Sequence, residues 1–452
     1  MSKNKFLFIL AAASLLALGS CGGRTAMSSG AAQGSSSAQT SSAALASSST
    51  TPSTSSSAVA SSSNNPSSTT SLSTVSSSTP VSSASSSEEE SQDGLVYILN
   101  GDKAGYTVVG YVSSETSVTI PSVYQGLPVT AIGDEAFRRS HIAEVSMPDS
   151  VTAIGRNAFY LCEKLASVTF SKGLISIGDF AFCNSAITSI SLPESLKKVG
   201  VRAFLNCSNL TYTTENGLSY LPSGANDYFL LADAAYGSLT TVTIRSETKA
   251  IEDCAFSNCL SLASFAVDSG NTNYSTDGKA LFNKDQTTLF AYAYCAGTSY
   301  SIPTTVTEIG DYAFFSCRYL ETLVLPSALI SIGDEGLGYC TGLNSLSLPA
   351  SLTGIGVYAF ENCASLTSIA LPASLTSIGE DTFYQCTDLA NVSLPASLTS
   401  IGDKAFYSCK KLATMNYNDT KAQWAKVTLG DDWHYDSTLL TAVTCTDGSV
   451  TL

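Results

Sequence analysis

The sequence is poor in the residues on which most catalytic and metal sites depend. Its 452 residues include two histidines, His141 and His434, and two tryptophans. Histidine is a common metal ligand and the usual base of a Ser-His-Asp triad, so both kinds of site are poorly supplied. The acidic residues are scattered over loops at a regular spacing and form no convergent set. We therefore expect no enzymatic activity, no cofactor and no metal.

Positive charge is also scarce. The chain has 22 Lys and Arg residues against 37 Asp and Glu residues, a formal net charge of −15. Nucleic-acid binding needs clustered basic side chains that displace counterions, and docking on an anionic membrane needs the same. The composition therefore argues against a nucleic-acid partner and against electrostatic membrane docking.

A long hydrophobic run is absent, but a short one lies near the N-terminus. Lys3 and Lys5 precede the apolar run from Phe6 to Leu18, whose 13 residues are too few to span a bilayer and suit a signal peptide. The residues Leu18-Gly19-Ser20-Cys21 resemble the lipobox of bacterial lipoproteins. The resemblance implies a signal peptide at 1–20, cleavage before Cys21 and acylation of Cys21, which anchors the chain to the cell envelope. An ordinary secretory signal with an incidental cysteine is the alternative.

Residues 21–93 are dominated by Ser and Thr after the anchor. A segment with so little apolar surface to bury is expected to stay disordered. As a flexible coil it would span on the order of 45 Å, enough to hold a domain clear of a lipid surface.

The rest of the chain is organised by a repeat whose last five copies start 23 residues apart. A fixed period of 20 to 29 residues that carries Leu-x-x-Leu-x-Leu indicates a leucine-rich solenoid. The Ile-Gly or Val-Gly pair of the repeat recurs at Ile132, Ile154, Ile177, Val199, Ile309, Ile332, Ile355, Ile378 and Ile401, and at Ile251 with Glu252 in place of glycine.

Each repeat predicts one coil. Leu366, Ile369 and Leu371 have strand spacing, and Gly379 is expected to give the corner its backbone freedom. Phe383 and Cys386, three residues apart, suit one helical turn that faces the core. We predict an α/β repeat fold: a solenoid of about ten 22–23-residue coils of parallel strands and short helical turns over residues 132–415.

Two interruptions break the period, near residues 211–250 and 265–305. Residues 217–234 read as two strands around a turn, and residues 273–297 carry turn signals in a hairpin-like pattern. A structural side flap and a binding element are both open readings of these insertions. The oxygen-rich loop at 268–278 lacks the calcium-loop pattern and is explained by turn chemistry.

Eight cysteines share one repeat position: Cys162, Cys207, Cys259, Cys317, Cys340, Cys363, Cys386 and Cys409. Equivalent side chains on stacked coils lie about 4.8 Å apart, farther than the Cβ spacing of a disulfide, so we predict buried free thiols. The sequence offers no pairing for Cys183, Cys254, Cys295 and Cys445, which lie off this ladder.

The repeated phrase Ile-Gly-x-x-Ala-Phe-x-x-Cys, followed by Leu-x-x-Ile-x-Leu-Pro, resembles the BspA-type leucine-rich repeat of bacterial surface proteins. The resemblance covers residues 95–452. It implies an N-terminal cap at 94–131 and a C-terminal cap at 416–452, where Trp424 and Trp433 lie. It also implies an adhesin that binds host proteins or neighbouring cells.

The outward strand positions are small and weakly polar, for example Ser345 and Ser347, whereas tight interfaces favour larger anchors. The tyrosines collect instead in or beside the interruptions, which we predict as the binding surface: Tyr212, Tyr220, Tyr228, Tyr274, Tyr292, Tyr294 and Tyr300. The expected partner is an extracellular protein bound by a monomer. A glycan-capturing protein that uses Tyr292 and Tyr294, and a structural envelope component without a specific ligand, remain alternatives.

Overall fold

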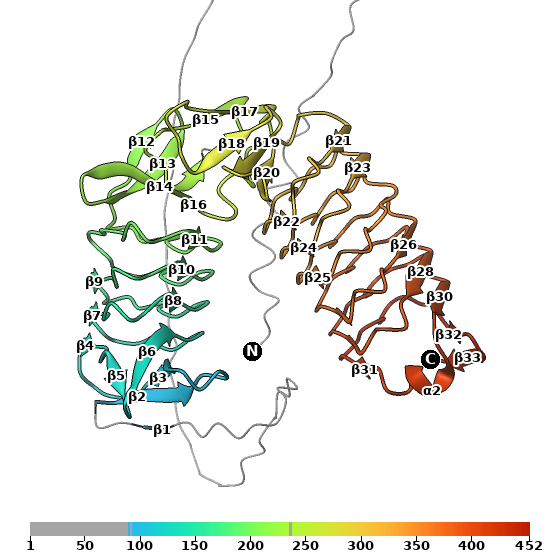
Figure 1. Cartoon of the computed structure of the whole chain (residues 1–452), viewed down its shortest axis with the longest axis horizontal. Helices are drawn as coiled ribbons and strands as arrows, with labels where there is room; N and C mark the ends of the chain where they lie inside the picture. Colours follow the sequence, from blue (N-terminus) through green and yellow to red (C-terminus); the bar gives the residue numbers. More distant parts are fainter. Residues whose placement is uncertain (1–88, 91–92, 235–236) are drawn as a thin grey trace, which may run out of the picture. The chain divides into compact units, whose positions relative to one another are not determined.

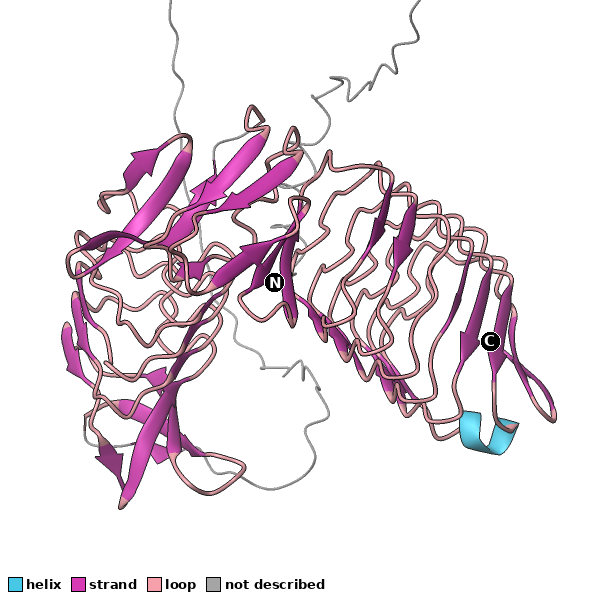
Figure 2. Cartoon of the chain, turned by 45° about the horizontal axis from the view of Figure 1, so that its top comes forward, coloured by secondary structure: helices cyan, strands magenta, loops and turns pink. Residues whose placement is uncertain are grey.

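The computed structural model describes residues 89–90, 93–234 and 237–452. Over this range the chain winds through successive coils of short strands joined by turns (Figure 1, Figure 2). The predicted signal peptide 1–20, the predicted acylation site Cys21 and most of the predicted tether at 21–93 lie outside the described residues. The end of the tether segment, Glu89–Glu90, forms strand β1 and pairs with β2.

Two ladders of parallel strands run through the coils. The first, which we call the Ile-Gly ladder, contains the repeated Ile-Gly pair, with Ile154 opposite both Ile132 and Ile177. Its strands are β6 (Leu127–Ile132), β8 (Ala153–Ile154), β10 (Ser176–Ile177), β11 (Lys198–Val199), β16 (Ala250–Ile251), β22 (Glu308–Ile309), β24 (Ser331–Ile332), β25 (Gly354–Ile355), β27 (Ser377–Ile378), β29 (Ser400–Ile401) and β31 (Thr428–Leu429). β5 (Val123–Tyr124), β2 (Leu95–Leu99) and β3 (Tyr106–Tyr111) precede this ladder, and β3 pairs parallel to β6.

The second ladder contains the Leu-x-x-Ile-x-Leu strands, and we call it the leucine ladder. Val392 lies opposite Ile369 on one side and Met415 on the other, and all three side chains are buried. Its strands are β4 (Ser117–Thr119), β7 (Glu144–Ser146), β9 (Ser167–Thr169), β15 (Thr241–Ile244), β17 (Ser264–Val267), β21 (Ser299–Ser301), β23 (Thr322–Val324), β26 (Ser368–Ala370), β28 (Asn391–Leu394), β30 (Thr414–Tyr417) and β32 (Ala442–Cys445), and β33 (Gly448–Thr451) closes it in antiparallel pairing.

The segment between the repeat glycine and the cysteine forms interleaved turns and not the predicted helical turn. Alternate N–H groups close turns within the coil, such as Arg138 N to Glu135 O at 3.0 Å. The others donate to the next coil, such as Phe137 N to Ala158 O at 2.8 Å and Arg139 N to Tyr160 O at 2.8 Å. This pattern pairs the backbone without a helix, and α2 (Lys421–Trp424) is the helix that the described residues contain.

Ten coils place two non-glycine residues of this turn segment in the left-handed region, at the second and sixth positions after the repeat glycine. Asp381 at φ 53° and Gln385 at φ 57° are one such pair. A left-handed residue with a side chain costs about 1–2 kcal/mol, which the hydrogen bonds between coils must offset. The same two sites recur from Glu135 and Arg139 to Asp432 and Asp436.

The repeat glycine is required by close approach between coils and not by its own φ, which corrects the predicted reason. A Cβ on Gly178 would lie 2.6 Å from Arg156 N. The aspartate that follows several of these glycines fixes the same contact, since Asp134 Oδ1 accepts the Arg156 N–H at 2.8 Å. A side chain at the glycine position would therefore push neighbouring coils apart.

The core contains two separate files of phenylalanines that stack from coil to coil. Phe137, Phe159 and Phe182 stack at 4.9 and 5.0 Å between ring centroids, and all are buried. Phe383 stacks on Phe360 at 5.2 Å and on Phe406 at 5.1 Å in the later coils. Each aromatic pair is worth about 0.5–1.5 kcal/mol beyond its burial.

Both interruptions form the predicted hairpins, but neither is a side flap. The first contains β12 (Thr213–Glu215), β13 (Leu218–Ser223) and β14 (Asn226–Ala234), and the second contains β18 (Tyr274–Thr276), β19 (Ala280–Asn283) and β20 (Thr288–Tyr292). β14 pairs in parallel with β16, and β20 pairs in parallel with β22. The last strand of each insertion therefore takes a place in the Ile-Gly ladder.

The predicted C-terminal cap contains one more coil. β31 pairs with β29 and β32 pairs with β30, so both ladders continue into it. Trp433 occupies the alanine position of the repeat, three residues after Gly430, and its ring meets Phe406 edge-on at 6.2 Å. The helix α2 lies between β30 and β31 and buries Trp424.

Candidate functional site

Four of the seven tyrosines predicted to form a binding surface are buried in the core. Tyr220 is 1% exposed, Tyr274 4%, Tyr292 5% and Tyr300 7%. Tyr220, Tyr274 and Tyr292 lie on the hairpin strands, which take part in the solenoid. Tyr300 lies on β21 of the leucine ladder, and its hydroxyl donates to Asp277 Oδ2 at 2.6 Å. These four residues cannot contact a macromolecule, which also removes Tyr292 from the predicted glycan-binding pair.

The other three tyrosines are partly exposed. The Tyr212 hydroxyl donates to Phe204 O at 3.2 Å. Tyr294 meets the exposed ring of Tyr319 edge-on at 5.6 Å. Tyr228 lies beneath the guanidinium of Arg245, whose Cζ is 3.9 Å from the ring centroid.

Tyr228 belongs to an open groove at the tip of the first hairpin. The groove has a volume of about 660 Å³ and is lined by Glu194, Ser223, Ala225, Asn226, Asp227, Tyr228, Glu247 and Lys249. That volume lies in the range of ligand sites, but the lining is polar and carries three carboxylates against one ammonium group. The groove is therefore suited to a polar or cationic segment of a larger partner.

Contacts with the surrounding chain hold the groove in shape. Asn226 Nδ2 donates to Glu247 O at 2.9 Å, and Ser223 Oγ donates to Glu194 Oε1 at 3.2 Å. Arg245 pairs with Glu215 and, at 3.3 Å, with Glu247. Hydrogen bonds lower the pKa of Glu247, that from Ser246 most, so its carboxylate is charged at neutral pH.

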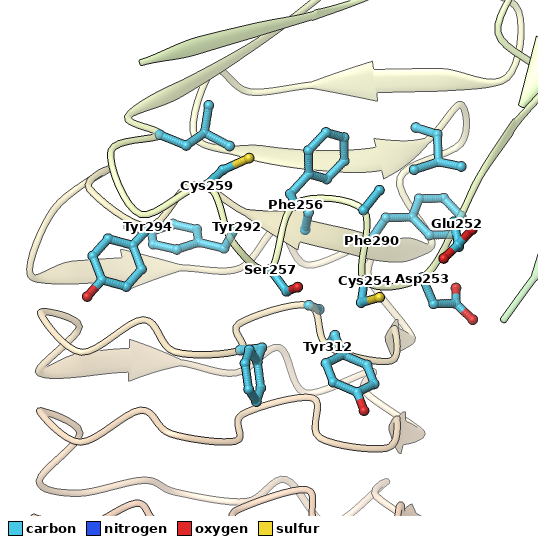
Figure 3. Close-up of a pocket in the computed structure, with 16 residues that line it drawn as sticks. Glu252, Asp253, Cys254, Phe256, Ser257, Cys259, Phe290, Tyr292, Tyr294 and Tyr312 are labelled. Carbon is cyan, nitrogen blue, oxygen red and sulfur yellow. The ribbon is translucent and has the colours of Figure 1, made fainter. Parts of the chain in front are cut away.

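A second hollow lies where the coil at Ile251 meets the second insertion (Figure 3). Its lining includes Asp253, Cys254, Ser257, Tyr294 and Tyr312. The free volume is about 30 Å³, which holds roughly two water molecules at about 10–15 Å³ each. It is too small for an organic substrate.

The groups in this hollow are also unsuited to nucleophilic catalysis. Burial first, and then the charge of Glu252, raise the pKa of the Cys254 thiol well above its usual value. The reactive form of cysteine is the thiolate, so this thiol is held in its unreactive state. Asp253 Oδ2 and Ser257 Oγ are buried and have no hydrogen-bond partner in the described part of the chain, which water molecules would supply.

Seven of the eight cysteines of the ladder are free thiols that donate a hydrogen bond. In seven coils the Sγ atom donates to a backbone carbonyl of the preceding coil, such as Cys162 to Phe137 O at 3.0 Å and Cys386 to Phe360 O at 3.1 Å. The set is Cys162, Cys207, Cys317, Cys340, Cys363, Cys386 and Cys409. Burial raises the pKa of Cys162 and of Cys409 to about 12, so these thiols stay protonated and donate. All seven are free and buried in the structure, and Cys259 is buried at the same position.

The hydroxyl groups at this position explain why serine can replace cysteine. Ser185 Oγ donates to Phe182 O at 2.5 Å within its own coil. Ser437, which the sequence analysis missed, donates to Phe406 O at 2.7 Å from the last coil. Its spacing of 28 residues from Cys409, caused by the inserted helix, hides it from a 23-residue search. Of the cysteines off the ladder, Cys183, Cys254 and Cys445 are free.

Sequence reasoning also missed a file of tyrosines on the turn segments of the last coils. Tyr384, Tyr407 and Tyr435 each lie five residues after the repeat glycine. Tyr407 stacks on Tyr384 at 5.1 Å and on Tyr435 at 5.4 Å, and Tyr435 is 59% exposed. A comparison of equivalent repeat positions would have found them.

The loop at 268–278 uses its oxygen atoms for its own chain. Asn271 is buried, its Oδ1 accepts the N–H groups of Asn273 and Tyr274 at 2.8 Å, and Asp277 Oδ1 accepts those of Lys279 and Ala280. Within residues 89–90, 93–234 and 237–452, no group of three or more His, Cys, Asp or Glu side chains is placed to hold a metal ion. The same residues contain no helix of the length and apolarity needed to span a bilayer.

Comparison with known proteins gives one family and several solved structures. The family model described as BspA type leucine rich repeat region matches in six copies over residues 130–229, 234–290 and 285–413. No curated protein matches. A leucine rich cell surface protein from Faecalibacterium prausnitzii A2-165 is 27% identical over 76% of this chain and 99% of that chain, with a TM-score of 0.43. A leucine-rich repeat protein from Eubacterium ventriosum ATCC 27560 is 22% identical over 79% and 98%, with a TM-score of 0.38, and pneumococcal vaccine antigen PcpA is 23% identical over 81% and 89%, with a TM-score of 0.35.

Proposed function

Because the chain belongs to the BspA-type leucine-rich repeat family, we propose that it is a bacterial surface protein whose solenoid binds an extracellular protein. The observation that carries the proposal is the contrast between its two hollows. The enclosed one admits about two waters, whereas the open groove at the first hairpin is broad, polar and held by hydrogen bonds. Of these two hollows, the open groove offers surface for a macromolecule, whereas the enclosed one is too small for an organic substrate.

The groove favours a partner with basic side chains. Asp227 is exposed at its rim, and Glu194 and Glu247 add two further carboxylates. Complementary charge accelerates the encounter of two proteins and excludes partners of like charge. Tyr228 would supply an aromatic contact, a type that interfaces favour.

Binding of the purified chain to an array of extracellular matrix and plasma proteins tests this proposal. A Glu194→Lys, Asp227→Lys variant should lose at least about tenfold in affinity, because each rim charge is reversed. A Glu163→Lys, Glu321→Lys variant changes the net charge equally at exposed positions elsewhere and serves as the control. Equal loss in both variants would show that net charge, and not the groove, controls binding; no binding to any protein would overturn the proposal.

Deletion of residues 217–234 is unsuitable as a test. Phe229, Leu230 and Leu231 of β14 are fully buried, and β14 pairs with β16. Removing the hairpin would open the core, so a lost interaction could reflect unfolding. Point substitutions at the exposed rim avoid this ambiguity.

Acylation of Cys21 would anchor the solenoid to the envelope, with residues 21–93 as the spacer. The proposal rests on the lipobox-like residues that precede Cys21. Labelling of cells with radioactive palmitate should mark the wild-type protein and not a Cys21→Ser variant. Labelling that persists in the variant would exclude this anchor.

Glycan capture is a second candidate function, favoured by the partly exposed pair of Tyr294 and Tyr319. Aromatic faces bind sugar rings through their apolar surface, in contrast to the charged groove. Binding of the wild-type protein and of a Tyr319→Ser variant to a polysaccharide array and to the protein array separates the two functions. Protein binding that survives this substitution while polysaccharide binding is lost would assign the pair to glycans.

A further inference from the structure

Three carboxyl groups are buried in successive coils of the C-terminal half. Glu335 is 7% exposed, Glu361 1% and Asp381 2%. They come from the coils at Ile332, Ile355 and Ile378, and each lies on the turn segment between the repeat glycine and the cysteine. Charged groups at such burial are rare unless they are paired.

Each carboxyl faces the hydroxyl of a tyrosine from the preceding coil. The Tyr312 hydroxyl donates to Glu335 Oε1 at 2.9 Å, and the Tyr339 hydroxyl donates to Glu361 Oε1 at 2.9 Å. The Tyr358 hydroxyl faces Asp381 at the equivalent place in the next pair of coils. The repeated pairing joins the coils from Ile309 to Ile378 through one row of neutral donors.

The carboxyl groups have little compensation for a negative charge. The described ion pairs include none of the three. Glu361 Oε2 and Asp381 Oδ1 are buried and have no hydrogen-bond partner within the described chain. A neutral carboxyl suits these surroundings better than a carboxylate, because burying an unpaired charge is costly.

The charged groups around the row are mostly acidic. Asp334 faces Glu335, and Glu335 and Asp381 both face Glu361. Glu380 and Asp403 face Asp381. On the positive side, Arg202 acts on Glu335 and Lys404 acts on Asp381. At Glu361, in the centre of the row, repulsion between carboxylates therefore adds to burial in disfavouring the charged form.

We propose that Glu335, Glu361 and Asp381 form a proton-dependent brace, which holds the C-terminal coils firmly while the carboxyls are protonated and loosens them when they ionise. The brace is independent of the proposed ligand, since none of its residues lines the groove at the first hairpin. A surface protein with this device would respond to the acidity around the cell.

The direction of the pH dependence follows from burial. Burial raises the pKa of Glu335 to about 7, of Glu361 to about 8 and of Asp381 to about 6. The folded state therefore binds protons that the unfolded state, with pKa values near 4, has already released. The stabilising contribution is complete below about pH 4 and is lost as the pH rises through about 6 to 8.

Hydrogen–deuterium exchange of the full chain, read by peptide and corrected for the intrinsic effect of pH, tests the brace. Amides of residues 332–386 should exchange at least about tenfold faster at pH 8.5 than at pH 5.5, whereas amides of residues 132–210 should not change. Equal behaviour of the two regions would overturn the proposal.

A Glu335→Gln, Glu361→Gln, Asp381→Asn variant should lose this pH dependence and exchange slowly at both values. The matched control Glu163→Gln, Asp285→Asn, Glu321→Gln removes three exposed charges and should keep the wild-type response. If the triple variant keeps the pH dependence of amide exchange, the proposal is wrong.

If the triple variant does not fold, infrared spectroscopy of the wild-type protein decides the question. Protonated carboxyl groups absorb separately from carboxylates, so their loss can be followed directly as the pH rises. Carboxyl absorption that persists above pH 6 and is reduced in the single variant Glu361→Gln supports the brace. Complete ionisation below pH 5 would rule it out.

Discussion

The coils at residues 132–210 precede the interruptions, and those at residues 306–415 follow them. The two sets have cores of the same kind but differ in their turn segments. We call them the N-terminal and C-terminal runs. The N-terminal run has seven acidic and eight basic residues, whereas the C-terminal run has ten acidic and four basic residues. At equivalent turn positions the first carries Arg138 and Arg202, and the second carries Tyr384 and Tyr358. The repeat thus preserves what faces inward and leaves the turn surface free to diverge.

The shared core is the part of this comparison that substitution should affect most. Phe182→Ala in the N-terminal run and Phe383→Ala in the C-terminal run each remove a fully buried ring from the stack. Each should lower the free energy of unfolding by about 3–5 kcal/mol. Urea unfolding followed by circular dichroism measures both, and a difference above about 2 kcal/mol would show that the two cores are not equivalent.

The cysteine ladder should show a smaller effect, again equal in both runs. Cys162→Ala and Cys386→Ala each remove a buried thiol and its bond to a carbonyl, at a cost of about 1–2 kcal/mol. Cys386→Ser should cost less, because Ser185 and Ser437 already donate from this position. The urea concentrations at the unfolding midpoint rank the variants by stability. A serine variant that is less stable than the alanine variant would contradict the role of this side chain as a hydrogen-bond donor.

The ion pairs of Lys198 connect the end of the N-terminal run to the beginning of the C-terminal run. Its Nζ lies 2.9 Å from Asp311 Oδ2 and 3.9 Å from Asp253 Oδ2. Because Lys198 is more than half exposed, Lys198→Ala should cost only about 0.5–1 kcal/mol, and less in high salt. Differential scanning calorimetry at low and high salt checks this, and a salt-independent loss would indicate that packing, not charge, is responsible.

The exposed end of the tyrosine file should contribute least to stability. Tyr435 contacts Tyr407 on one side and is otherwise largely exposed. Tyr435→Ser should change the free energy of unfolding by no more than about 0.5 kcal/mol, in line with surface substitutions. A larger loss in urea unfolding would mean that the file supports the last coil.

The sequence was sufficient to predict the coils because their spacing is regular. Leu366, Ile369 and Leu371 recur with the period, and the structure places their equivalents in the core of the leucine ladder. The thiol state of Cys386 followed from the same regularity, since stacked coils fix the distance between equivalent side chains. Repetition converts a local pattern into a three-dimensional prediction.

The errors arose where the repeat was broken or where its conformation is unusual. The burial of Tyr292 depends on β20 joining the Ile-Gly ladder, which no local pattern reveals. The spacing of Phe383 and Cys386 is equally consistent with a helical turn and with the interleaved turns that occur. The last coil escaped detection because α2 shifts Ser437 out of the 23-residue period.

The interleaved turns also give the solenoid a polarity. Glu135, Phe137 and Arg139 donate their N–H groups forward, to carbonyl groups about 21 residues later in the sequence. Each such coil therefore depends on the coil that follows it for the partners of these N–H groups. The last coil has no successor of its own kind, and it is there that the helix α2 is inserted.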